Sequence, residues 1–504
     1  MAEITKNSIL AVIEEVTEGV PILPTAATDF VALQDGFAAE PGFTSLENAE
    51  LKPSIGSSKP IAGLETPTFS MSHYLRHSGV AGTAPQYKKL LKALFGSETA
   101  IATEHTVAAA STVSVVNVAG GTGASHPRGS ALLLKHAASA WEIRSVKTRS
   151  TDALTLGFDA LVAPASGIGV GKPVTYFPEN TAHPSLTLAL YRGNGGALEV
   201  LSGMRVTEGT IEIAAGELIN TSFSLEGVKY SFDPIEVTAS TDTLDFTDSA
   251  AAAKVATVTA KLYRTPHELA DSLMTAMNAA GGADTYTVIY NDRGALAGKF
   301  TISSSATPFT LRFATGANTA QTIASKVGFA VADETGAQSY NSDVVQSWGA
   351  AYSPTYDSAD PISAKYLELL IGDQQDTTCV CASTVSIAIA NTRTPIPCIC
   401  AETGQQGSVI SARETTAEVT LLLEKHDAER FENMRQNDTV GLQFSFGTKT
   451  GGNWDAGKSG AIYIPAAVIT NHVVDDADGL VVINLSLKGH VDSSGNPEVY
   501  MSFV

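Results

Sequence analysis

GMRVTEGTIEIAAGELINTSFSLEG, residues 203–227, and AAVITNHVVDDADGLVVINLSLKG, residues 466–489, decide the fold of this chain. Both stretches are typical of β-hairpins. With one gap opposite Glu217, seven of their 24 aligned pairs are identical: Thr207/Thr470, Ala214/Ala477, Gly216/Gly479, Leu218/Leu480, Ser224/Ser486, Leu225/Leu487 and Gly227/Gly489. Similarity of this kind defines an architectural unit, and two copies are too few for a solenoid. The repeat therefore predicts a duplicated domain.

The same elements precede both hairpins in the same order. Residues 68–75 alternate between apolar and polar side chains, as a half-buried strand does, and residues 85–96 follow with helical spacing between a proline and a glycine. Residues 416–423 alternate in the same way, and Asp427 offers an N-cap to a helix that runs through Met434. Strand, helix and hairpin thus recur together, which favours duplication over a chance match.

Composition limits the classes of function. The chain has 504 residues, of which 44% are hydrophobic and 17% charged, which is enough for roughly three domains of about 150 residues. A net charge of −20 argues against a protein that grips nucleic acid through its phosphates, and it suits a surface that repels a polyanion. No long apolar run and no charged leader occur, so we expect neither a membrane span nor a secretory signal. Four cysteines fit a reducing compartment.

These patterns divide the chain into three parts. We predict a first domain over residues 1–235, an inserted α+β domain over 236–345, and a second copy of the first domain over 346–504. The fold class is α+β with mainly antiparallel sheet, built from two β-sandwich or barrel domains that each carry a flanking helix. Residues 6–17 are expected to form a short helix in the first domain.

The insertion has a pattern of its own. Thr265-Pro266-His267-Glu268 is a capping box with proline at the first helical position, and Gly281-Gly282 ends that helix. Three strands are expected after it, followed by a helix over 319–327; the strands are Tyr286–Tyr290, Lys299–Ser303 and Phe309–Phe313. This block interrupts the two copies without belonging to their repeat.

Residues 452–459, GNWDAGKS, match the letters of a phosphate-binding P-loop. A working P-loop is followed by a helix, whose N–H groups and dipole point at the phosphate. Here residues 460–465 are strand-like and end at a proline, and residues 193–198 form a similar turn without the lysine. We interpret the motif as a hairpin turn.

The four cysteines form two Cys-x-Cys pairs, Cys379/Cys381 and Cys398/Cys400. If the chain turns near residue 389, Cys379 faces Cys400 and Cys381 faces Cys398, and four thiolates on one face of a sheet have the chemistry to hold zinc. The other interpretation is that these small apolar residues pack in a sheet. It is favoured because structural zinc sites commonly use Cys-x₂-Cys spacing.

No catalytic constellation is present. His73 and His77 have the spacing of helical metal ligands, but His73 lies in an alternating strand, so both are interpreted as core or surface histidines. Residues 475–479 resemble part of a calcium loop without its later ligands, and Asp-Gly between two strands is an ordinary turn. We expect no enzyme activity, no cofactor and no metal.

Three consecutive segments form a recognisable series: residues 50–67, ELKPSIGSSKPIAGLETP, the strand after them, and residues 83–96, TAPQYKKLLKALFG. In this order they resemble the major tail tube protein of long-tailed bacteriophages. The resemblance covers 1–235 and, through the repeat, 346–504. It implies a β-sandwich flanked by a helix, and assembly into stacked six-fold rings around a lumen that conducts DNA. The insertion resembles a module of other phage structural proteins at residues 298–303, 309–311, 315–316 and 327–329.

Two tube-type domains in one chain imply that three chains, not six, close a pseudo-hexameric ring. The expected place is the phage tail of the virion, with synthesis and assembly in the cytoplasm of the bacterial host. The implied partners are other copies of this chain, the tape-measure, tail-terminator and tail-tip proteins, and phage DNA that passes without specific binding; no membrane is involved. The alternative is a phage decoration or adhesion protein that binds host-surface glycans through the inserted domain.

The resemblance also gives roles to residues. The hairpins over 206–227 and 469–489 would supply lumen strands, where small polar and acidic groups repel phosphates. The expected lumen-facing residues are Asn220, Ser222, Ser224, Glu226, Val482, Asn484, Ser486 and Lys488, and the expected core-facing residues of the second hairpin are Val481, Ile483, Leu485 and Leu487. Two proline-punctuated loops, 53–67 and 391–412, are expected to touch the next ring through Pro53, Pro60, Pro395 and Pro397. The insertion is expected on the outside.

Overall fold

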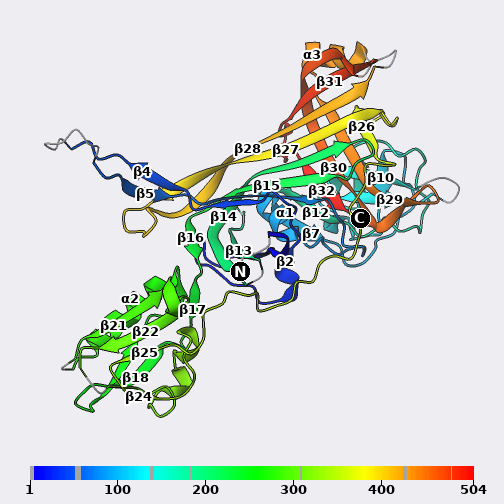
Figure 1. Cartoon of the computed structure of the whole chain (residues 1–504). Helices are drawn as coiled ribbons and strands as arrows, with labels where there is room; N and C mark the ends of the chain where they lie inside the picture. Colours follow the sequence, from blue (N-terminus) through cyan, green and yellow to red (C-terminus); the bar gives the residue numbers. More distant parts are fainter. Residues whose placement is uncertain are drawn as a thin grey trace.

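Antiparallel strands dominate the computed structural model of this chain, which describes residues 5–50, 58–136, 141–181, 183–193, 195–282, 284–306, 309–423, 428–477 and 479–504. Seventeen strands belong to one large curled sheet, and three α-helices occur in the described ranges (Figure 1). The predicted class, α+β with mainly antiparallel sheet, is confirmed. Within these same ranges, none of the helices is both long and apolar enough to pass through a bilayer.

The first copy ends near residue 232. Its elements are η1 (Thr5–Asn7), β1 (Ile9–Glu14), η2 (Ala27–Asp29), β2 (Phe30–Val31), β3 (Ala38–Glu40), β4 (Phe43–Leu46), β5 (Ile61–Glu65), β6 (Thr68–Tyr74), α1 (Lys88–Phe95), β7 (Gly96–Ala100), β12 (Val174–Pro178), β13 (Leu186–Arg192), β14 (Ala197–Ala214), β15 (Asn220–Glu226) and β16 (Lys229–Phe232). Between β7 and β12 a separate four-stranded sheet is inserted, made of β8 (Val115–Asn117), β9 (Ala131–Leu134), β10 (Glu142–Ser150) and β11 (Ala153–Leu156), with η3 (Gly123–Ser125).

The second copy begins near residue 368 and runs to the end of the chain. Its elements are β26 (Glu368–Gly372), β27 (Ala382–Pro397), β28 (Gln405–Leu422), α3 (Ala428–Gln436), β29 (Val440–Thr450), β30 (Asn453–Ala477), β31 (Leu480–Gly489) and β32 (Tyr500–Phe503). The helix predicted through Met434 is therefore present, and its predicted N-cap, Asp427, lies outside the described residues.

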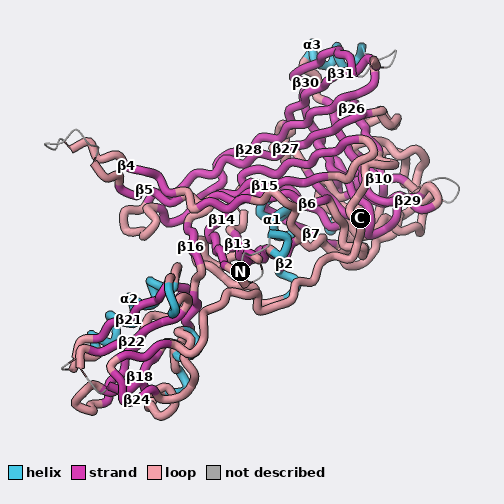
Figure 2. The backbone as a smooth tube through the Cα atoms, viewed as in Figure 1, coloured by secondary structure: helices cyan, strands magenta, loops and turns pink. Residues whose placement is uncertain are grey.

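The insertion has its own hydrophobic cluster and forms a small body at the lower left of Figure 2. It contains β17 (Ile235–Val237), β18 (Thr243–Thr247), β19 (Ala253–Thr257), β20 (Lys261–Tyr263), α2 (Pro266–Ala279), β21 (Tyr286–Asn291), η4 (Gly294–Leu296), β22 (Lys299–Ser304), β23 (Phe309–Leu311), η5 (Thr319–Gln321), η6 (Ala324–Lys326), β24 (Glu334–Ala337) and β25 (Ser339–Asn341). Thr265 caps α2 as predicted: its hydroxyl accepts from the Glu268 N–H at 3.2 Å. The helix predicted over 319–327 is wrong, since that stretch forms two short 3₁₀ turns.

The two copies match strand by strand and in register. β1, β13, β14 and β15 correspond to β26, β29, β30 and β31, and the hairpin formed by β3 to β6 corresponds to β27 and β28. The same register shift interrupts the β13–β14 and β29–β30 pairs at the same place; the matched pairs are Leu186↔Met204 with Val440↔Ala467, and Leu188↔Leu201 with Leu442↔Ile464. The two halves therefore share a β-bulge as well as a strand order.

The copies are joined side by side within one sheet. β14 pairs with β27, from Glu208↔Ala390 to Ala214↔Thr384. The strand order across the junction is β3, β6, β15, β14, β27, β28, β31, β30, which places four strands of each copy in one continuous surface (Figure 1). Backbone hydrogen bonds therefore unite the two halves of the repeat.

One hydrophobic cluster spans both copies and runs from Leu10 to Phe503, so the copies do not bury separate cores. Helix α1 covers the inner face of the sheet at β14. A Cβ atom on Gly209 would lie 2.4 Å from the Leu94 side chain, so glycine at this position lets the helix approach the strand. Helix α3 packs against β30 in the equivalent place, where the Phe431 ring lies 5.7 Å from the His472 ring.

The helix predicted over 6–17 is wrong. Residues 9–14 form β1, which pairs with β13 on one edge and β2 on the other. Its burial pattern shows why: Leu10, Ala11, Val12 and Ile13 are all buried, as expected for a strand with both faces covered. The short apolar run fits strand and helix alike, and tertiary pairing decided the outcome.

Candidate assembly surface

One face of the eight-stranded sheet is polar and points away from the core. Along β15, buried Thr221, Phe223 and Leu225 alternate with partly exposed polar residues, and the neighbouring strands β6, β14, β27 and β28 alternate in the same way. Acidic residues dominate the outward positions, which carry the carboxylates of Glu40, Glu208, Glu212, Glu226, Glu414, Glu418 and Asp475 and the ammonium group of Lys488.

The seven polar residues predicted to face outward do so. Asn220, Ser222, Ser224 and Glu226 occupy the partly exposed positions of β15. Asn484, Ser486 and Lys488 occupy the same positions of β31, and the Lys488 ammonium lies 2.6 Å from the Glu414 carboxylate on the neighbouring strand.

The prediction is wrong at the start of β31. Val481, expected in the core, is half exposed, and Val482, expected outside, is buried. Val481 lies near the free end of the hairpin, beyond the reach of the core. The direct cross-strand partners of Val482 are Leu422 on β28 and Asp475 on β30.

The two outer edges of the shared sheet are open. Among the described residues, no strand pairs with the second edge of β30 from 471 to 477, or with the second edge of β3. An unpaired strand edge presents a row of N–H and C=O groups that can template another strand. Each chain therefore has one open β30 edge and one open β3 edge available for pairing.

Residues at the β30 edge lack the burial that a neighbouring strand gives to their equivalents on β14. Ile211 on β14 is 5% exposed because β27 pairs beside it, with Ile387 as its direct partner. Its equivalent on β30 is Val474, which is 54% exposed. Val473 is also exposed. The burial that the internal junction provides is absent at the open edge, so this edge has the character of a surface that a further strand covers.

Two β-hairpin arms extend from the sheet at the left of Figure 1, one from β4–β5 and one from β27–β28. The loops predicted over 53–67 and 391–412 are therefore wrong where strands form, at Ile61–Glu65 and over 391–397 and 405–412. Pro395 pairs with Ser408 and Pro397 with Gln405, beyond the point where β14 stops pairing with β27, so both prolines lie where one strand edge is open and proline is tolerated.

Pro60, one of the predicted contact residues, is exposed just before β5. Pro53 lies outside the described residues. Pro395 and Pro397 thus lie in a strand of one arm and Pro60 directly before a strand of the other, and the contact role of the four prolines stays a prediction.

An ion-pair cluster ties the insertion to the end of β5 and to the turn that closes the β27–β28 arm. Arg264 lies 2.5 Å from Glu65 on β5 and 3.1 Å from Glu402 in the β27–β28 turn, and Lys229 lies 2.9 Å from Glu402. Burial raises the pKa of Glu402, but Lys229 and Arg264 lower it by more, so the carboxyl has a pKa below its usual value. Nothing in the local sequence pattern around Arg264 indicated this role.

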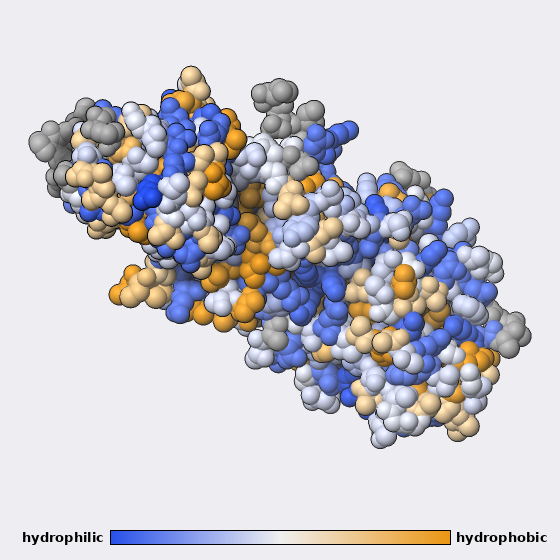
Figure 3. Space-filling view, turned by 90° about the horizontal axis from the view of Figure 1, so that it is seen from below, coloured by the Kyte–Doolittle hydropathy of each residue, from blue (hydrophilic) through white to orange (hydrophobic). Residues whose placement is uncertain are grey.

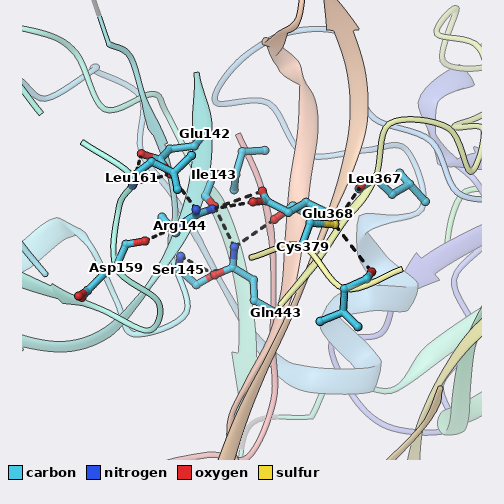
Figure 4. A network of polar contacts seen from close by, with 12 residues as sticks. Glu142, Ile143, Arg144, Ser145, Asp159, Leu161, Leu367, Glu368, Cys379 and Gln443 are labelled. Carbon is cyan, nitrogen blue, oxygen red and sulfur yellow. Dashed lines mark hydrogen bonds and ion pairs between the residues drawn. The ribbon is translucent and has the colours of Figure 1, made fainter. Parts of the chain in front are cut away.

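A second polar network fixes the small sheet of β8–β11 to the second copy (Figure 4). The Arg144 guanidinium is fully buried and lies 2.8 Å from Glu142 and 3.3 Å from Glu368, and His136 lies 2.6 Å from Glu142. The Gln443 side chain bridges two backbone groups of β10, donating to the Ile143 carbonyl and accepting from the Ser145 N–H, each at 2.9 Å. These groups satisfy one another, which is the arrangement expected of a structural network.

The motif with P-loop letters is a hairpin turn, as predicted. Gly451 and Gly452 adopt positive φ angles between β29 and β30, and β30 starts at Asn453. No helix follows, so there is no helix N-terminus to receive a phosphate.

The predicted facing of the cysteine pairs is wrong. Cys379 and Cys381 precede β27, and Cys398 and Cys400 follow it, so the 16-residue strand separates the pairs by roughly 50 Å. The described residues contain no cluster of three or more side chains able to hold a metal ion.

His73 is a core residue of β6. Its ring lies 4.2 Å from the Tyr87 ring and 5.8 Å from the Phe223 ring, and burial lowers its pKa from 6.5 to about 4. His77 is also buried, and burial lowers its pKa as well.

Comparison with known proteins gives little. No family model and no curated protein matches the chain. Among solved structures, the SPP1 tail tube matches with a TM-score of 0.20 and 16% identity, over 29% of this chain and 80% of that chain. A TM-score of this size carries no argument about function, so the proposal below rests on the geometry of the sheet.

Proposed function

We propose that this chain is a structural protein of a phage tail tube, which assembles into rings of three chains that stack into a tube. The observation that supports this proposal is the β14–β27 junction. At this junction, a strand of the first copy pairs with a strand of the second. The equivalent edges of β30 and β3, at the two outer sides of the shared sheet, are unpaired. Joining the open edge of β30 to the open edge of β3 in another chain repeats the junction between chains.

The internal junction supplies the register that we propose for that contact. β14 and β27 pair so that Ile211 lies opposite Ile387. The equivalents of these residues are Val474 on β30 and Ala39 on β3. We therefore propose that Val474 of one chain pairs with Ala39 of the next, and that Val473 pairs with Glu40. Strand pairing that closes a ring removes the exposed edges that otherwise favour uncontrolled aggregation.

Charge suggests which face lines the tube. The inner face of the sheet is covered by α1, α3 and the shared core, so the acidic outward face is the one available to a lumen. Duplex DNA carries a dense negative charge, and a negative wall gives its phosphates no site to bind. DNA would thus pass without specific binding. The insertion, which lies apart from the shared sheet, would project outward.

The remaining parts of the proposal are those that such a tube requires. Tape-measure, tail-terminator and tail-tip proteins would meet its ends, the assembled protein would belong to the virion, and the chain would have no enzyme activity. Assembly through strand pairing needs no cofactor and no membrane.

Electron microscopy of the purified chain tests this function. Hollow tubes of uniform width are expected, from the full chain and from a variant without residues 240–342. Discrete particles that never form rings or tubes, at any protein concentration, would contradict the proposal. Binding of glycans by the full chain, lost on deletion of 240–342, would instead favour the adhesion alternative.

A further inference from the structure

An apolar tip closes the β27–β28 arm. The turn over 398–404 is held by a hydrogen bond from the Cys398 N–H to the Gly404 carbonyl at 3.0 Å. Ile399 projects from it with a relative exposure of 104%, and Ile396 and Cys400 beside it are exposed as well. A cluster of this kind on an otherwise acidic, polar protein is unusual unless it meets a partner.

A pocket lies at the other end of the same strand. It has a volume of about 320 Å³ and is lined mainly by apolar groups, among them Ile213, Leu367, Leu369, Val380 and Phe444. Cys379 and Cys381 also line it. Apolar walls with few polar groups suit an aliphatic side chain. Figure 3 shows that hydrophobic side chains on one face of the molecule gather between the smaller and the larger body.

We propose that the Ile399 tip of one chain inserts into this pocket on a chain of the next ring, and that this contact stacks the rings. The tip and the pocket lie roughly 50 Å apart at opposite ends of β27, so one displacement along the strand brings the tip of one copy to the pocket of another. A contact between two different surfaces of the same molecule repeats without limit when the displacement does not close, which builds a filament. The inference rests on the proposed function.

The cysteines support this contact independently. All four cysteines of the 504 residues belong to the tip or to the pocket. Three of them, Cys379, Cys381 and Cys400, are exposed in the single chain. Stacking would cover these thiols and place the Cys398/Cys400 pair beside the Cys379/Cys381 pair of the neighbouring ring.

The native thiols provide the test. Assembled protein is treated with a short bismaleimide, and the products are separated under denaturing conditions. We expect a ladder of linked chains whose cross-linked peptides join residue 398 or 400 to residue 379 or 381. C398S/C400S and C379S/C381S variants should each lose the ladder while still assembling. Wild-type tubes without such links, or with links only between identical positions, would overturn the inference.

Substitution at the tip separates stacking from ring formation. Ile399→Asp should leave single rings in micrographs and stop their growth into tubes, because a carboxylate does not enter an apolar pocket, whereas Ile399→Leu should give normal tubes. Full-length tubes from Ile399→Asp would refute the stacking contact and leave the proposed function intact. Absence of rings from the wild-type chain would refute the proposed function itself.

Discussion

Thr207 and Thr470 occupy the same position in two copies of one hairpin, and their hydroxyls make the same hydrogen bond. The Thr207 hydroxyl donates to the Ser224 carbonyl at 3.0 Å, and the Thr470 hydroxyl donates to the Ser486 carbonyl at 3.0 Å. Each threonine is the extra residue at a register shift, between Val206 and Glu208 in one strand and between Ile469 and Asn471 in the other. Two of the seven identical pairs of the sequence repeat, Thr207/Thr470 and Ser224/Ser486, thus meet in a hydrogen bond at a β-bulge.

Removal of the Thr207 hydroxyl should destabilise the chain. Thr207→Val keeps the shape and removes one hydrogen bond, which is worth about 1 kcal/mol of unfolding free energy. Thr470→Val should cost less, because Thr470 is exposed and water replaces its partner. Urea unfolding of the unassembled chain measures both, with Thr207→Ser as the variant that retains the bond. Equal stability of Thr207→Val and the wild type would show that the bulge does not need this contact.

Gly209 should tolerate no side chain. The Cβ atom of Gly209→Ala would lie 2.4 Å from Leu94 in the helix that covers β14, and overpacking of this kind costs about 1–3 kcal/mol. Thermal unfolding should show a lower Tm for Gly209→Ala and almost no change for Gly349→Ala, since nothing lies within 4 Å of the Cβ position at Gly349. Combining Gly209→Ala with Leu94→Ala should cost less than the sum of the two single changes. Additive effects would mean that the helix does not lie against Gly209.

Stability should fall on acidification below pH 6.5, partly because of His73. Burial lowers the His73 pKa from 6.5 to about 4, so the folded state binds fewer protons than the unfolded state between these values. The stabilisation is present above pH 6.5 and is lost as the pH falls toward 4, by up to about 3 kcal/mol.

Urea titrations of the unassembled chain at pH 7.0, 6.0 and 5.0 measure this loss. His73→Phe, which fits between the rings of Tyr87 and Phe223, should show a smaller loss over that range than the wild type. An identical pH profile in the two proteins would remove His73 from the explanation.

Reversal of charge on the outward sheet face should make the tube bind DNA. Changing Glu208, Glu212 and Glu418 to lysine alters the net charge by six units on that face, and binding of duplex DNA to tubes should appear and should weaken steeply with salt. A matched control places three lysines on the insertion at Glu236, Asp271 and Asp292, all exposed. DNA retained inside the tubes by the first variant and not by the control is the expected result. Equal retention by both would argue against a lumen lined by this face.

Much of the architecture could be predicted from the sequence, since local patterns carry it. The Thr265 cap of α2, the alternation of β6 and β15 and the order of elements in each copy depend on neighbouring residues, and the structure contains them all. The failures arise where distant strands decide. Residues 9–14 became a strand because β13 and β2 pair with them.

The junction between the copies escaped prediction for the same reason. Val385, Ile387 and Ile389 alternate with small or polar residues and could have marked β27 as a strand, but which strand would pair with it depends on β14, more than 170 residues away. The proline pair in 395–397 suggested a loop, because proline usually ends a strand. Because one edge of this arm is open, the N–H that proline lacks is not needed for strand pairing, so proline does not weaken the strand there.

The central claim is that three chains close a ring by joining β30 to β3 in the register of the internal junction. The test uses a chain whose four native cysteines are changed to serine and which carries Ala39→Cys and Val474→Cys. Oxidation of the assembled protein then reports both the number of chains in the ring and the register of the contact. The account predicts linked dimers and trimers, ending at the mass of three chains of 52.4 kDa each, and none of these products when Val473→Cys replaces Val474→Cys. Products that continue beyond three chains, or equal cross-linking in both variants, would contradict it.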